Sequence, residues 1–98
     1  MTMTDHPDTY VARWRNAILD DRALSSSQKL VAIIMAQCAD PETGRSCYPT
    51  NAELAQRANL GVRTVQIARR ALRDGGWIAQ ERANELAPSL YSLTFPAR

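Results

Sequence analysis

Apolar residues recur along this chain at two different spacings, and the change of spacing divides the chain into elements. Over residues 8–19 and 25–39 they return every three or four positions, the period of a helix with a buried face. Two shorter helices are predicted at 51–58 and 62–74. Alternation of apolar and polar positions at 77–82 and 90–95 predicts an antiparallel hairpin. A small strand at 45–48 precedes the second pair of helices.

The predicted helix ends are marked by local signals. Ser25 is followed three residues later by Gln28, and Thr50 is followed in the same way by Glu53. This spacing is typical of a capping box, in which the two residues satisfy each other's backbone amides at a helix start. Glycines at 75 and 76 offer the left-handed turn that closes the last carbonyls of helix 62–74.

A short break separates the helices 51–58 and 62–74. Asn59 and Gly61 tolerate positive backbone angles and are expected to supply a sharp reversal, with Leu60 plugging the angle between the helices. Helix 51–58 has one apolar face at helical spacing, which predicts a buried stripe of Leu54, Ala55 and Ala58.

The first helix carries the apolar stripe Tyr10, Trp14 and Ile18. Packing of this stripe on the chain's own core is the favoured interpretation. A dimer or partner contact through the same three residues is the alternative, because Trp is enriched at interface hot spots. Residues 1–7 lack periodicity and are expected to be a disordered tail. Residues 8–23 form the N-terminal helix and linker, and 24–98 the main domain.

Composition fits one small intracellular domain, with 98 residues, 45% of them hydrophobic. We expect a cytoplasmic location, because no signal peptide or membrane span is visible. Cys38 and Cys47 have no CxxC spacing and His6 stands alone, so we expect buried or half-buried free thiols, no metal and no cofactor. Enzyme signatures are absent too: there is no glycine-rich phosphate loop and no nucleophile motif.

Charge is distributed unevenly along the chain. Residues 1–44 hold four basic and six acidic side chains, net −2, whereas residues 45–82 hold seven basic and three acidic ones, net +4. The basic part therefore coincides with the helical pair. A solvated helix face is the less favoured explanation of these arginines, whereas codon usage explains the preference for arginine over lysine equally well.

The segment LAQRANLGVRTVQIARRALRDGGWI, together with the order of elements, resembles the winged helix-turn-helix domains of bacterial and phage regulators and replication proteins. The resemblance covers about residues 24–95. It implies a mainly α (α+β) fold, with a three-helix core, a C-terminal β-hairpin wing and an extra N-terminal helix. The chain departs from the family pattern at Asn59, where glycine is common, and at Gly61, where a serine or threonine cap is usual.

The resemblance implies that Leu54, Leu60, Val65, Ala68 and Leu72 face the core. It makes helix 62–74 the recognition helix, and the side that the core does not use becomes its reading face. Arginine suits guanine, glutamine suits adenine, and apolar side chains suit thymine methyls. The expected base-reading residues are Val62, Arg63, Gln66, Ile67 and Arg70. The expected phosphate contacts are Arg45, Thr50, Arg57, Thr64, Arg69, Arg73, Arg82 and Asn84.

The predicted wing tip, 83–89, contains Glu85 and no lysine or arginine, so most of the DNA contact falls to helix 62–74. The predicted function is sequence-specific binding of double-stranded DNA. The chain would act as a small transcriptional regulator or a replication-origin-binding module of a bacterium, phage or plasmid, and as a homodimer on two half-sites. The alternative is a winged-helix module that binds protein through Trp14, Leu86 or the hairpin, with little DNA affinity.

Overall fold

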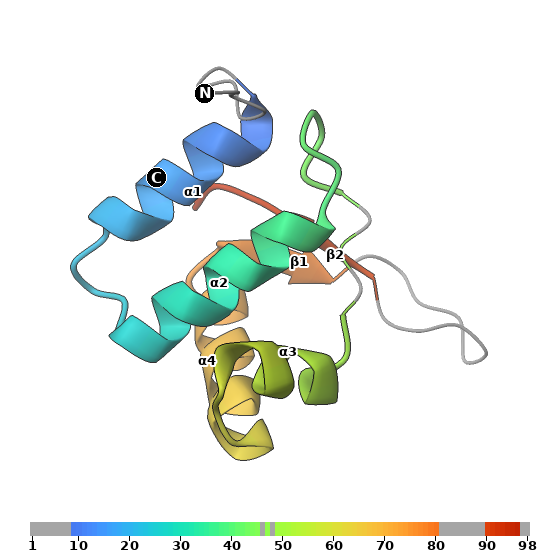
Figure 1. Ribbon diagram of the computed structural model, residues 1–98. Coiled ribbons are helices and arrows are strands. Elements are labelled where there is room, and N and C mark those ends of the chain that lie inside the picture. Colours follow the sequence, from blue (N-terminus) through green and yellow to red (C-terminus); the bar gives the residue numbers. More distant parts are fainter. Residues whose placement is uncertain (1–8, 46, 48, 81–89, 97–98) are drawn as a thin grey trace, which may run out of the picture.

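The structure is a computed structural model and describes residues 9–45, 47, 49–80 and 90–96. Within these residues the chain forms four helices and a two-stranded antiparallel sheet, and the helix Ser26–Cys38 contacts the other three helices (Figure 1). The predicted mainly helical, winged helix-turn-helix fold is confirmed. In chain order the elements are α1 (Tyr10–Asp20), α2 (Ser26–Cys38), α3 (Asn51–Ala58), α4 (Val62–Asp74), β1 (Ile78–Gln80) and β2 (Tyr91–Leu93).

The helix starts follow from the residues just before them. Ser25 and Gln28 form the predicted capping box. The backbone amide of Gln28 donates to the Ser25 hydroxyl at 3.2 Å, and the backbone amide of Ser25 donates to Gln28 Oε1 at 3.0 Å. Thr50 and Glu53 form the second predicted box at the start of α3. Both start signals act within three residues, which is why the sequence predicts them correctly.

The helix-turn-helix turn closes α3 through Asn59, which has a left-handed φ of 58°. The Leu60 amide reaches back to the Ala55 carbonyl at 3.0 Å, and the Asn59 amide to that of Gln56 at 3.3 Å. This is the bonding pattern of a Schellman motif. Gly61 differs from expectation, because its φ of −72° is extended and any residue adopts it. Asn59 alone makes the reversal.

The end of α4 uses the same motif. Gly76 has a φ of +85°, the Trp77 amide donates to the Leu72 carbonyl at 2.8 Å, and the Gly76 amide donates to that of Arg73 at 3.0 Å. Leu72 and Trp77 are both buried, as this motif favours. The glycine stop is confirmed, with Gly76 rather than Gly75 in the left-handed conformation.

The core draws on every helix and on both strands. The predicted buried face of the helical pair is confirmed, since Leu54, Ala55, Ala58, Val65, Ala68 and Leu72 are all buried, and Leu60 packs against the core as a half-buried plug. The largest fully buried side chains are Trp14, Ile18, Met35, Leu54, Leu72, Leu93, Val31, Val65 and Cys47.

Helix α1 packs its apolar stripe into this core. Trp14 and Ile18 are both 0% exposed, and Trp14 Nε1 donates to the carbonyls of Trp77 at 3.1 Å and Thr94 at 2.7 Å. The half-buried Tyr10 donates its hydroxyl to the Leu93 carbonyl at 2.7 Å. Core packing was the favoured interpretation. The alternative dimer or partner contact is therefore wrong for Trp14 and Ile18, which the chain itself encloses.

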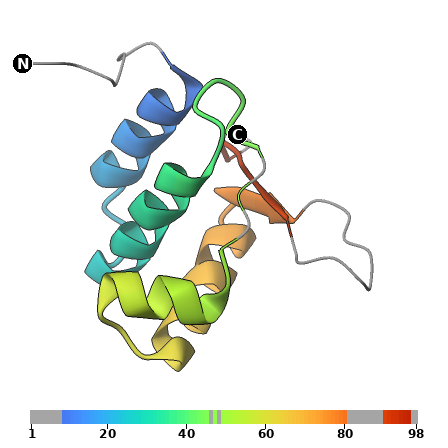
Figure 2. The same ribbon diagram turned by 45° about the vertical axis from the view of Figure 1, so that its right-hand side comes forward.

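Among the described residues the hairpin strands are Ile78–Gln80 and Tyr91–Leu93, and they pair Ile78 with Leu93 and Gln80 with Tyr91. Of the small strand expected at 45–48 the structure describes residues 45 and 47, and Cys47 exchanges backbone hydrogen bonds of 3.0 and 2.7 Å with Tyr91. Figure 2 shows the sheet next to the C-terminal end of α4, from which β1 follows. The predicted wing tip at 83–89 lies outside the described residues.

Candidate nucleic-acid interface

Helix α4 has one buried face and one exposed face. Val65, Ala68 and Leu72 are buried, at three- and four-residue spacing, so the rest of the circumference is left to other contacts. All five expected base-reading residues are exposed: Val62, Arg63, Gln66, Ile67 and Arg70. Ile67 is 55% exposed, so this apolar side chain is not part of the core, and it lies on a strongly basic helix.

The period of the helix determines the direction in which each of these side chains points. At about 100° per residue, Arg63 and Arg70 lie within about 20° of each other and point almost directly away from the buried stripe. Ile67 stands to one side of them. Gln66 and Arg73 stand on the other side, towards the start of α3 and strand β2, where they line a pocket.

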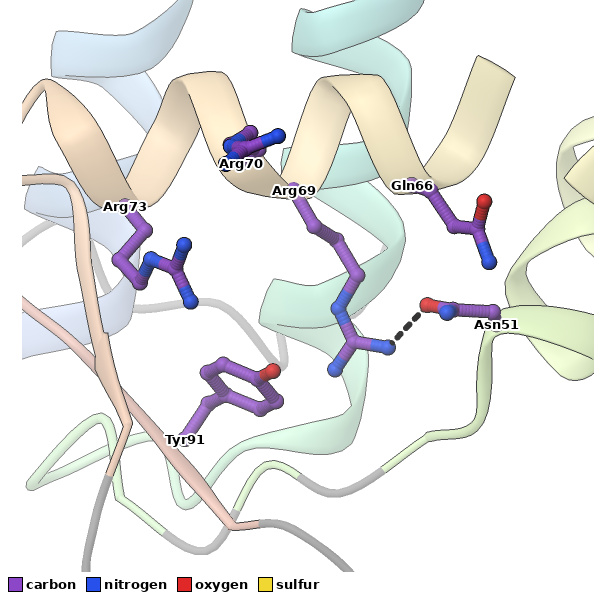
Figure 3. A pocket seen from close by; sticks show the side chains of 6 residues that line it. All are labelled: Asn51, Gln66, Arg69, Arg70, Arg73 and Tyr91. Atoms are coloured by element: carbon purple, nitrogen blue, oxygen red, sulfur yellow. Dashed lines mark hydrogen bonds between the residues drawn. The ribbon is translucent and has the colours of Figure 1, made fainter. Parts of the chain in front are cut away.

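That pocket has a volume of about 240 Å³ and lies between three elements (Figure 3). Its wall on α4 carries three guanidinium groups. Asn51, the first residue of α3, and Tyr91, the first residue of β2, form the opposite side. The described residues that line it include no carboxylate; they are Asn51, Gln66, Arg69, Arg70, Arg73 and Tyr91.

Arg69 crosses this pocket and joins its walls. Its Nη1 donates to Asn51 Oδ1 at 2.6 Å, and its guanidinium carbon lies 4.3 Å from the centroid of the Tyr91 ring. The side chain is half-buried, its Nε has no hydrogen-bond partner, and desolvation lowers its pKa below the usual arginine value. These contacts connect α3, α4 and β2, and they occupy a side chain that we expected to serve a DNA phosphate.

Sequence reasoning missed the contacts of Arg69 with Asn51 and Tyr91. One signal was present: Arg69 follows Val65 by four residues and so lies beside the buried stripe of α4. An arginine in that position extends along the protein surface instead of away from it. The partner Tyr91 had no local signal, because it lies 22 positions further along the chain.

The start of α3 is less suited to a phosphate than expected. The Thr50 amide donates to Glu53 Oε1 at 2.8 Å, and the Thr50 hydroxyl accepts from the Glu53 amide at 3.0 Å. Hydrogen bonds with Thr50 lower the pKa of Glu53, the backbone bond more than the side-chain bond. The Glu53 side chain at this helix start is therefore a negatively charged carboxylate. The Thr50 amide is therefore used within the chain, whereas its hydroxyl only accepts from Glu53 and keeps its own O–H for another acceptor.

The remaining expected phosphate contacts are spread over several elements. Arg57 on α3, Thr64 and Arg73 on α4, and Arg45 before the Cys47 bridge are all exposed. Only Arg73 among them also lines the pocket. Arg82 and Asn84 fall outside the described residues.

The cysteines do not form a reactive pair. Cys47 is buried and donates to the Met35 carbonyl at 3.2 Å, and desolvation raises its pKa to about 12. Cys38 is exposed, whereas we expected a buried or half-buried thiol. The described part of the chain contains no group of three metal-binding side chains. It also contains no helix with the length and apolar content that crossing a bilayer requires.

The chain was compared with families of known proteins. Residues 22–78, more than half of the chain, match a family described as "Helix-turn-helix domain". The match includes α2, α3, the turn and all of α4, and it ends as β1 begins. No curated protein and no solved structure matches the chain significantly.

Proposed function

The chain belongs to the helix-turn-helix domain family, whose members bind DNA, and from this we propose that it reads double-stranded DNA sequence-specifically with α4 in the major groove. The observation that carries the proposal is the exposed face of α4. This face combines two arginines that point in one direction with an exposed apolar side chain beside them. On this face the exposed Ile67 can contact a thymine methyl while the neighbouring arginines reach the bases.

The spacing of the two arginines fits base readout. Arg63 and Arg70 are seven residues apart, so they are separated by about 10 Å along the helix axis. That distance corresponds to about three base-pair steps. Each guanidinium can donate two hydrogen bonds to O6 and N7 of one guanine. Between them, Gln66 suits an adenine and Ile67 suits a thymine methyl.

We infer that the protein works as a homodimer on two half-sites, because one recognition helix covers only a few base pairs. Trp14 and Ile18 are enclosed in the core, so the contact between copies uses another surface. The role as a small transcriptional regulator or a replication-origin-binding module, of bacterial, phage or plasmid origin, is part of the same proposal. A protein-binding module anchored by Trp14 is disfavoured by the burial of that residue.

The test is selection of binding duplexes from a random-sequence library by the full chain, followed by gel shifts over a range of salt concentrations. Arg63→Ala and Arg70→Ala should each weaken specific binding and relax the preference at one base pair. Arg22→Ala is the matched control, because Arg22 is exposed in the connection between α1 and α2, outside α3, α4 and the sheet. If no duplex is enriched while the chain stays folded, the proposal is wrong.

A further inference from the structure

The arginine-lined pocket beside α4 holds positive charge without a counter-charge among the residues described. Three guanidinium groups, those of Arg69, Arg70 and Arg73, line a space of about 240 Å³, and the described lining contains no Asp or Glu. Like charges in a partly enclosed space repel more strongly than they would in open water. An anion in the pocket would remove this repulsion.

Arg69 shows that the charge is partly desolvated. It is half-buried, and burial lowers the pKa of its guanidinium. Its two contacts, the Asn51 amide oxygen and the face of the Tyr91 ring, are neutral groups, so neither cancels the charge. The uncompensated positive charge of the pocket therefore favours binding of an anion.

The remaining groups of the pocket are donors. Since Asn51 Oδ1 accepts from Arg69, the amide is oriented and its Nδ2 hydrogens are left for another acceptor. The Tyr91 hydroxyl can donate as well. Figure 3 shows the Arg73 side chain extending from α4 towards Tyr91, with Arg69 between Tyr91 and Asn51. Guanidinium, amide and phenol donors around one space match the unesterified oxygens of a phosphate group.

We propose that this pocket binds one phosphodiester group of the DNA backbone, held by Arg73, Asn51 and Tyr91, with Arg69 as the positioning residue that orients the last two. The inference rests on the proposed function, because it assigns a phosphate to the DNA that α4 reads. The three ligands come from α4, α3 and β2. The bound phosphate thus fixes the recognition helix relative to the base of the wing, and with it the depth of α4 in the groove.

The experiment combines a protein variant with DNA duplexes in which a single backbone phosphate is neutralised. Selected duplexes are prepared with a methylphosphonate at one backbone position at a time and titrated with the parent chain, Arg73→Ala and the control Arg22→Ala. At one position per half-site, the methylphosphonate should weaken binding by the parent about tenfold and binding by Arg73→Ala less than about twofold. For Arg73→Ala the slope of log affinity against log salt should fall by about one at each pocket, with sequence preference unchanged.

The outcomes separate the two proposals. If no duplex is selected, the proposed function fails and this inference fails with it. If duplexes are selected but every methylphosphonate affects Arg73→Ala and the parent equally, only the pocket assignment is overturned. A second arm titrates the parent chain with sodium phosphate while the Asn51 side-chain amide is followed by NMR. Saturation by free phosphate, without coupling to any DNA phosphate, would assign the pocket to a small anion and overturn the inference.

Discussion

Replacing Arg69 by methionine separates two roles for this side chain, a contact with DNA phosphate and a connection between elements of the protein. Methionine keeps a long, flexible, apolar stem but removes the guanidinium that reaches Asn51 and Tyr91. A phosphate contact and an internal connection predict different results in two measurements, namely stability without DNA and the salt dependence of DNA binding.

The expected loss of stability follows from the two contacts. The stacked contact with Tyr91, at 4.3 Å, is worth about 1 kcal/mol in a half-buried setting. The hydrogen bond to Asn51, at 2.6 Å, has a charged donor and contributes about 1.5 kcal/mol. Part of this is offset, because burying the guanidinium in the folded state costs solvation. We therefore expect Arg69→Met to lower the free energy of unfolding by about 1–2 kcal/mol.

Urea denaturation without DNA measures this change. The buried Trp14 and Trp77 provide the fluorescence signal, and an unchanged denaturant slope would show that the unfolded states are comparable. In the DNA titration, the salt slope of Arg69→Met should equal that of the parent, because an internal connection releases no counterion from DNA. Specific affinity should fall, since the geometry of α4 against β2 is less well fixed.

Arg73→Met is the matched control, one helical turn further along α4 and exposed. It should show the reverse pattern, with a salt slope reduced by about one for each copy bound and a stability change below about 1 kcal/mol. The reasoning is refuted if Arg69→Met leaves stability unchanged and reduces the salt slope as Arg73→Met does. Arg69 would then be a phosphate contact, as the sequence pattern first indicated.

Three further predictions concern stability and thiol chemistry. Gly61→Ser should raise the free energy of unfolding by about 0.5–1 kcal/mol in urea titrations, because φ is −72°, no atom lies within 4 Å of a Cβ built there, and serine caps α4. Trp14→Phe should lower it by about 2–4 kcal/mol in the same assay, since the Thr94 carbonyl loses its 2.7 Å donor and a cavity forms. At pH 8 a thiol reagent should label one cysteine, Cys38, in the folded chain. Cys47 should react only on unfolding. The free energy of unfolding should fall as pH rises from 9 towards 12, because the Cys47 thiol ionises near pH 9 in the unfolded chain but only near pH 12 in the folded one.

Local signals predicted most of the fold, and long-range contacts explain what they missed. The capping boxes at Ser25 and Thr50 and the reversal at Asn59 involve groups three to five residues apart, so a short stretch of sequence contains the whole interaction. The stripe of α1 is different. Periodicity shows that Trp14 belongs to an apolar face, but its partners are the carbonyls of Trp77 and Thr94, 63 and 80 residues away.

The candidate site divides in the same way. Which side chains of α4 are exposed follows from its period and from the buried positions Val65, Ala68 and Leu72, so the base-reading set could be named from sequence. The pocket could not be predicted, because it forms only where Asn51 and Tyr91 approach α4 from two other elements. Arg69 was assigned to phosphate for the same reason: its partners are set by tertiary structure.

The family match ends at residue 78, but the core does not. Trp14 and Ile18 from α1 and Leu93 from β2 lie outside the matched range of 22–78, and all three are almost completely buried. Helix α1 also holds the base of the hairpin, through the Trp14 bonds and the Tyr10 bond to the Leu93 carbonyl. Because Arg69 joins the hairpin to α4 through Tyr91, a change that loosens α1 also reaches the recognition helix. The matched segment alone would expose the core that α1 and β2 cover, so we expect it to bind DNA more weakly than the longer chain does.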